Sequence, residues 1–146
     1  MAYLITNQDY NLYRIASNEN EKNDVNCFYP PYIAIDISDV DFLKIKKGIG
    51  EANISNGSAT VTDLDLSGFY INEDELKVYH SDIIRRLKSF LRNKDSSKVL
   101  YSTCQTYERN LRNFDYSTIT FPIAWKTWEQ YCEDNSITYI HPLQIP

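Results

Sequence analysis

The stretch "INEDELKVYHSDIIRRLKSFLRN", residues 71–93, decides the fold class of this chain. After Gly68, just upstream of it, the spacing of apolar residues changes from a period of two to about 3.6, which is the change from strand to helix. Asn72, with Glu75 three residues later, fits a capping box and predicts the helix start. The apolar side of this predicted helix consists of Leu76, Ile83, Leu87, Phe90 and Leu91. Strands followed by helices predict an α+β fold.

The residues before this helix favour a small antiparallel sheet. Polar stretches separate three short segments rich in β-branched and aromatic residues, and the longest of these stretches, residues 17–26, is predicted to be a solvated loop. The predicted strands cover residues 2–6, 11–16 and 32–37.

A short helix and a hairpin are predicted next. Ser38 precedes Asp41 by three residues, which predicts a helix of two or three turns that stops at Gly48. In "EANISNGSATVT", residues 51–62, Asn56-Gly57 suits the two positive-φ positions of a type I′ turn. We therefore expect a β-hairpin over residues 51–62.

Two more helices are predicted downstream. One begins near Asp95 or Ser96, and the other begins at Thr120, with Pro122 in its first turn, and ends at Asn135. The apolar stripes are Leu100, Cys104, Tyr107, Leu111 and Phe114 in the first, and Trp125, Trp128 and Cys132 in the second. The chain thus divides into a β-rich part (1–72), a three-helix part (73–136) and an extended C-terminal arm (137–146).

The arm, "ITYIHPLQIP", carries no charged side chain other than a histidine. Ordering such a segment costs backbone entropy, so it is expected to be held, either on its own sheet or on a partner. Its two prolines favour an extended segment that reaches outward to a partner. The predicted partner-binding residues are Trp125, Trp128, Tyr131, Ile137, Tyr139, Leu143 and Ile145.

Composition bounds the class of protein. The 146 residues are 42% hydrophobic, enough for one domain core, and no apolar run approaches the roughly 20 residues that span a bilayer. No signal-peptide pattern is visible, so we expect a soluble protein made in the cytoplasm, with no membrane partner. Cys27, Cys104 and Cys132 are odd in number and lack a zinc-site spacing, which predicts free structural thiols.

One pattern suggests a cation site. Asp63, Asp65, Ser67 and Gly68 occupy positions 1, 3, 5 and 6 of a calcium loop of the EF-hand type, and Asp74 occupies position 12. Position 12 normally holds glutamate, and a hairpin rather than a helix precedes the loop. We interpret these carboxylates as a strand exit and a helix N-terminus, and expect no metal and no cofactor.

No catalytic set is recognisable in the sequence. His80 and His141 are the two histidines, and neither has a flanking motif that supplies a nucleophile. The carboxylates Asp36, Asp39 and Asp41 are candidates for acid–base work without supporting partners. We therefore expect a protein that is not an enzyme.

Charge is uneven along the chain. Residues 73–113 contain 9 basic and 6 acidic residues, whereas the whole chain has a net charge of -5. This balance argues against nucleic-acid binding. The basic residues are interpreted as a solvated helix face, with phosphate binding and contact with an acidic partner, including another copy, as alternatives. They are Arg85, Arg86, Lys88, Arg92, Lys94 and Lys98.

Two stretches, "ISDVDFLKIKKGIGEANISNGSATVTDLD" (37–65) and "TWEQYCEDNSITYIHPLQIP" (127–146), together resemble small accessory and assembly proteins of tailed bacteriophages. The resemblance implies a non-enzymatic role as a structural or adaptor component of the virion, in the tail, baseplate or tail fibre. A tail-fibre assembly chaperone is the alternative, and a small enzyme or calcium-binding module is a more distant one. The implied partners are other virion or tail-fibre proteins, with homo-oligomers within the assembly.

Overall fold

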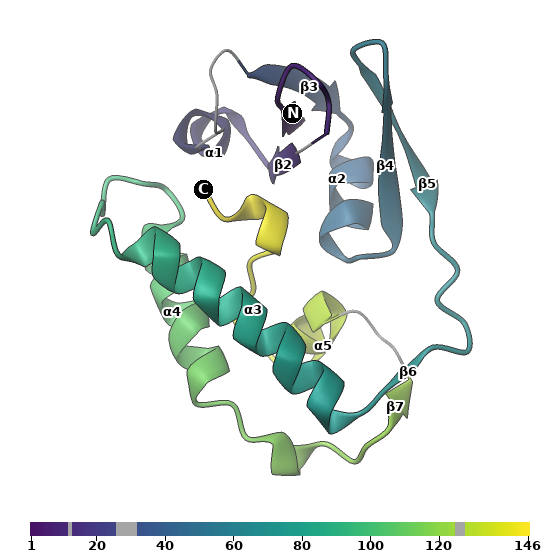
Figure 1. Ribbon diagram of the computed structural model, residues 1–146, viewed down its shortest axis with the longest axis vertical. Coiled ribbons are helices and arrows are strands. Elements are labelled where there is room, and N and C mark those ends of the chain that lie inside the picture. The colour runs from purple at the N-terminus through teal and green to yellow at the C-terminus, as the bar shows by residue number, and fades with distance from the viewer. Residues whose placement is uncertain (12, 26–31, 125–127) are drawn as a thin grey trace.

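The computed structural model describes residues 1–11, 13–25, 32–124 and 128–146. Its N-terminal part is an antiparallel sheet of β1 (Ala2–Thr6), β2 (Tyr13–Ala16) and β3 (Ile33–Ile37), in the order β2-β1-β3 (Figure 1). β1 is the central strand and pairs Leu4 with both Ile15 and Ile35. The three predicted strands are therefore confirmed.

The predicted loop over residues 17–26 is wrong, because a short helix, α1 (Glu19–Asp24), lies there. The Asn18 side chain caps it by accepting a hydrogen bond from the Glu21 amide at 3.0 Å. Glu21 is itself buried and accepts a hydrogen bond from the Ser17 amide at 2.8 Å. Local capping thus outweighs the polar composition on which the loop prediction rested.

The short helix and the hairpin are confirmed. They are α2 (Asp39–Lys46), capped by Ser38, and the strands β4 (Gly50–Ser55) and β5 (Ser58–Asp63). Asn56 and Gly57 have φ values of 51° and 79°, as a type I′ turn requires. α2 packs so closely on the hairpin that a Cβ atom at Gly50 would lie 2.8 Å from Lys44 Cβ.

The helical part begins with α3 (Glu73–Leu91), which has the predicted Asn72–Glu75 capping box. α4 (Tyr101–Arg112) packs beside α3 but starts later than predicted. The reason lies in the Asp95 side chain, which accepts a hydrogen bond from the Ser97 amide at 3.1 Å and forms a turn instead of a helix cap.

The third predicted helix also starts later. After a 3₁₀ turn at η1 (Tyr116–Thr118), the chain extends as β7 (Ile123–Ala124) and pairs with β6 (Tyr70–Ile71). Helix α5 (Trp128–Asp134) follows. Pairing with β6 keeps residues 123–124 extended, so the helix expected from Thr120 cannot include them; Trp125 lies outside the described residues.

Buried side chains form two clusters. One lies between β1, β3, α2 and the hairpin, and the other lies among α3, α4, α5 and the C-terminal segment. Strands dominate the first half of the chain and helices the second, so the α+β class is confirmed. Among the helices of the described residues, none combines the length and the apolar character that crossing a bilayer would require.

Candidate interaction surface

The C-terminal segment folds back onto its own protein, which corrects the prediction of an arm that reaches outward. It runs between the sheet and α3 and ends in a 3₁₀ turn, η2 (Pro142–Gln144) (Figure 1). Ile140 is 1% exposed and Ile145 is 5% exposed. The Gln144 side-chain amide donates to Glu21 Oε2 at 3.1 Å, which joins the segment to α1. The sequence indicated that these apolar side chains must be removed from water, and the protein's own core buries them.

The aromatic residues predicted to bind a partner also face inward. Trp128 is 3% exposed, its Nε1 donates to the Tyr107 hydroxyl at 2.6 Å, and its ring stacks on that of Tyr131. Ile137, Tyr139 and Leu143 are half-buried against the two core clusters. The described residues of this set pack within or against the protein's own core clusters, and their assignment to partner binding stays a prediction.

Of the two histidines, His80 is buried and His141 is half-buried. His80 packs 4.2 Å from the Trp128 ring centroid, and its Nδ1 lies 2.7 Å from the Tyr116 hydroxyl. Burial lowers the pKa of His80 to about 4. Burial, with Lys46 and Arg86 nearby, lowers the pKa of His141 to about 4 as well. Both imidazoles are therefore neutral near pH 7 and help to fill the core.

The described thiols are also buried. Cys104 and Cys132 are free cysteines in the helical core, and burial raises the pKa of each thiol to about 12. A thiol with such a pKa is a poor nucleophile near neutral pH. Cys27 lies outside the described residues.

The carboxylates of the calcium-like pattern are engaged separately. Asp63 ends β5 and its Oδ1 lies 2.9 Å from Lys44 Nζ, whereas Asp65 accepts a hydrogen bond from the Ser67 amide. Asp74 lies in the first turn of α3. Within residues 1–11, 13–25, 32–124 and 128–146, no three His, Cys, Asp or Glu side chains are grouped to hold a metal ion.

The remaining acidic candidates, Asp36, Asp39 and Asp41, are also spread out. Asp36 is an exposed residue of β3, and Asp39 and Asp41 lie in the first turn of α2. A carboxylate in the first turn of a helix complements the helix dipole.

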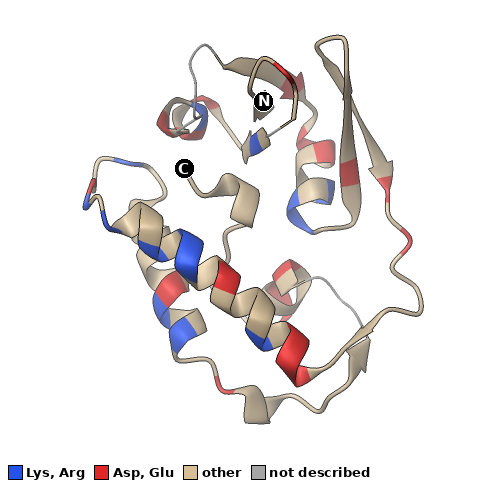
Figure 2. Ribbon diagram, viewed as in Figure 1, with Lys and Arg blue, Asp and Glu red and all other residues tan. Residues whose placement is uncertain are grey.

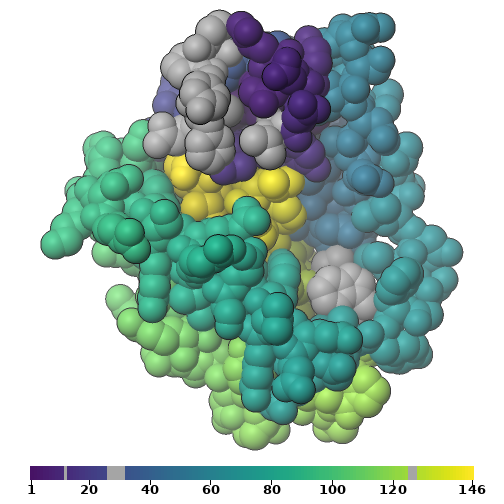
Figure 3. Space-filling model, in the orientation of Figure 1, coloured from purple at the N-terminus to yellow at the C-terminus, as the bar shows by residue number. Residues whose placement is uncertain are grey.

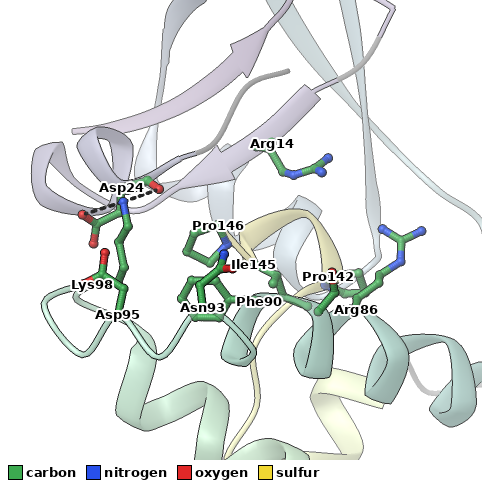
Figure 4. Close-up of a pocket in the computed structure, with 11 residues that line it drawn as sticks. Arg14, Asp24, Arg86, Phe90, Asn93, Asp95, Lys98, Pro142, Ile145 and Pro146 are labelled. Atoms are coloured by element: carbon green, nitrogen blue, oxygen red, sulfur yellow. Dashed lines mark hydrogen bonds and ion pairs between the residues drawn. The ribbon is translucent and has the colours of Figure 1, made fainter. Parts of the chain in front are cut away.

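A cleft of about 690 Å³ lies where α1, α3 and the C-terminal segment meet (Figure 4). Several of its charges are already paired within the protein. Asp24 accepts a hydrogen bond from the Val99 amide at 2.6 Å and lies 3.9 Å from Lys98 Nζ, and Arg86 Nε donates to Asp82. The two contacts of Asp24 hold α1 against the α3–α4 connection.

The basic residues of the sequence do not form one band. Lys98 and Arg86 line the cleft, whereas Arg85, Lys88 and Arg92 lie on the solvent side of α3. This solvent side, which we call the outer face of α3, follows steps of four and three residues along the helix. It consists of the exposed residues Asp74, Val78, Ser81, Arg85, Lys88 and Arg92. The buried side consists of Leu76, His80, Ile83, Leu87 and Phe90.

The outer face of α3 changes the sign of its charge along its length. Figure 2 shows acidic residues at the start of α3 and basic residues towards its end. In the space-filling view α3 lies across the visible face of the molecule (Figure 3). Val78, between the charged ends, is 71% exposed.

Exposed apolar residues continue just before α3. Phe69 is 59% exposed and Tyr70 is 63% exposed, and Leu64 is exposed as well. Gly68, with φ of 79°, turns the chain immediately before Phe69. Sequence reasoning missed this surface because no local pattern shows whether distant parts of the chain cover Phe69 and Tyr70. Together with the outer face of α3 they form the candidate interaction surface of the described residues.

Comparison with known proteins adds no relative: no family model, no curated protein and no solved structure matches this chain.

Proposed function

We propose that this chain acts without catalysis, through protein–protein contacts, as a structural component of a tailed-phage virion in the tail, baseplate or tail fibre. The observation that carries the protein-binding part is the exposure of Phe69, Tyr70 and Val78 on neighbouring stretches of chain. The virion part rests on the sequence resemblance of residues 37–65 and 127–146.

The exposed aromatic residues support a protein partner on energetic grounds. A large apolar side chain gains about 1.5 to 3 kcal/mol when a contact removes it from water. Aromatic residues are enriched in the centres of protein interfaces, whereas charged residues are depleted there. Phe69 and Tyr70 are consecutive residues and both are exposed.

The state of the reactive side chains agrees with a binding role. His80 is buried and His141 is half-buried, the pKa of each imidazole is lowered to about 4, and the described thiols have raised pKa values. Catalytic groups normally combine a tuned pKa with access to a substrate. Here the shifts of His80 and Cys104 accompany burial in the helical core.

Quantitative mass spectrometry of purified particles tests this proposal. A virion component is expected at a fixed copy number, which symmetric assemblies impose. Phe69→Ser with Tyr70→Ser should reduce incorporation, and Val99→Ser, an exposed apolar site in the α3–α4 connection, serves as the matched control.

Two outcomes would contradict the proposal. Absence from particles together with co-purification with a tail fibre would identify an assembly chaperone instead. Unchanged incorporation of the folded Phe69/Tyr70 variant would show that this surface is not the one that binds.

A further inference from the structure

We propose that the partner of the outer face of α3 is a second copy of this chain, bound with the two α3 helices antiparallel. The inference deepens the proposed protein-binding role and rests on it in treating this face as an interface. It rests on the charges of the helix, which are acidic at one end and basic at the other. Two copies of such a helix place opposite charges side by side only when they are antiparallel.

The charged residues are placed symmetrically about Ser81. Asp74 precedes Ser81 by seven residues and Lys88 follows it by seven, so each lies about 10 Å from Ser81 along the helix axis at a rise of 1.5 Å per residue. If a twofold axis passes at Ser81, Asp74 of each copy lies beside Lys88 of the other. A parallel pair would instead place Asp74 against Asp74.

The same axis also matches the flanking residues. Arg92 follows Ser81 by eleven residues, which places it beyond the first turn of the other copy's α3, on the side of the preceding segment that carries the exposed Tyr70. A guanidinium over an aromatic ring is an attractive contact. At the centre, Ser81 is small enough to let the helices approach to about 8 to 10 Å, with Val78 on either side.

These charges are available for an intermolecular contact. Within the described residues, Asp74, Lys88 and Arg92 form no ion pair, and all three are exposed. Arg85 forms an ion pair with Asp82, and Lys77 forms one with Glu73, so these two basic residues contribute less to a contact between two copies. Glu75 is committed to the capping box of its own helix.

The helix dipole explains only part of this pattern. It favours acids in the first turn and bases in the last, and its effect fades within those turns. It does not account for Val78, which is 71% exposed in the second turn, or for the exposed Tyr70 before the helix. An antiparallel partner centred on Ser81 covers Val78.

The size of the face sets the expected strength. The 19 residues of α3 are about 28 Å long, so one helix pair with its flanking segments falls in the class of small, weak interfaces. We therefore expect a dimer with a Kd of about 1 to 100 μM, weakened by salt because its ion pairs are exposed.

Sedimentation equilibrium of the full chain, with exchange of charges, tests the proposal. Asp74→Lys places two lysines together at each contact, and Lys88→Asp places two aspartates together, so each variant alone should dimerise about tenfold more weakly or worse. A mixture of the two variants restores both ion pairs and should form a heterodimer of wild-type strength. The double variant Asp74→Lys/Lys88→Asp should recover the homodimer.

Controls make the result specific. Lys94→Asp changes the same charge in the α3–α4 connection, off the outer face, and should leave dimerisation unchanged. Circular dichroism checks that every variant is folded, which is expected because all substituted side chains are exposed.

A wild-type chain that stays monomeric at millimolar concentration and low salt would overturn the dimer while leaving the particle test of the proposed function unaffected. A dimer that is weakened by each single variant but not restored in their mixture would overturn the antiparallel arrangement.

Discussion

Truncation of Ile140 measures how much the C-terminal segment contributes to the fold. This side chain is 1% exposed and lies in the helical core cluster. Ile140→Ala removes buried methylene and methyl groups and leaves a cavity, which costs about 2 to 5 kcal/mol in well-packed cores. A domain of this size has a total stability of about 5 to 15 kcal/mol, so the loss is a large fraction of it.

The expected loss is measurable in two ways. Urea denaturation should show a lower midpoint with an unchanged m-value, since the extent of unfolding is the same. Thermal unfolding should shift downward by about 4 to 20 °C, at about 2 to 4 °C per kcal/mol for chains of this length. Val99→Ala, at a half-exposed apolar site in the α3–α4 connection, is the control and should change stability by less than about 0.5 kcal/mol.

One result would refute the reasoning. If Ile140→Ala is as stable as Val99→Ala, then the C-terminal segment is not packed on its own core in solution. The prediction from the sequence, an arm that binds a partner, would then regain support.

Two further predictions concern titration and packing. The free energy of unfolding should fall as the pH drops from 6.5 towards 4. The unfolded chain protonates His80 and His141 at their usual pKa, whereas the folded chain, in which both pKa values are about 4, does not. An NMR titration that shows either imidazole of the folded protein titrating near pH 6.5 would contradict these lowered pKa values. Gly50→Ala should destabilise the protein by about 1 to 3 kcal/mol in urea denaturation, because the added Cβ would lie 2.8 Å from Lys44 Cβ and 2.9 Å from Val61 Cγ1, and unchanged stability would mean that α2 packs less closely on the hairpin.

Local signals in the sequence determined most of the elements. The Asn72–Glu75 capping box, the Ser38 cap and the Asn56-Gly57 turn each depend on residues within three positions of one another, so their outcome needs no distant partner. The helical period after Gly68 similarly identified the buried side of α3. These features suffice for the α+β class.

Only the tertiary structure decided the conformation of residues 123–124 and the position of the C-terminal segment. Residues 123–124 are strand because they pair with β6, more than fifty positions earlier in the chain. The C-terminal segment packs on its own core because Ile140 and Ile145 are buried among helices from earlier in the chain, and Gln144 donates to Glu21, in a helix that polar composition concealed.

The same holds for the candidate surface. The sequence showed many aromatic residues and one stretch of basic residues, but not which of them meet water. Trp128 is buried because α3, α4 and the C-terminal segment surround it, whereas Phe69 and Tyr70 stay exposed because none of the described elements covers them. Burial of a side chain is a property of all its neighbours together, and those neighbours come from parts of the chain that local pattern cannot bring together.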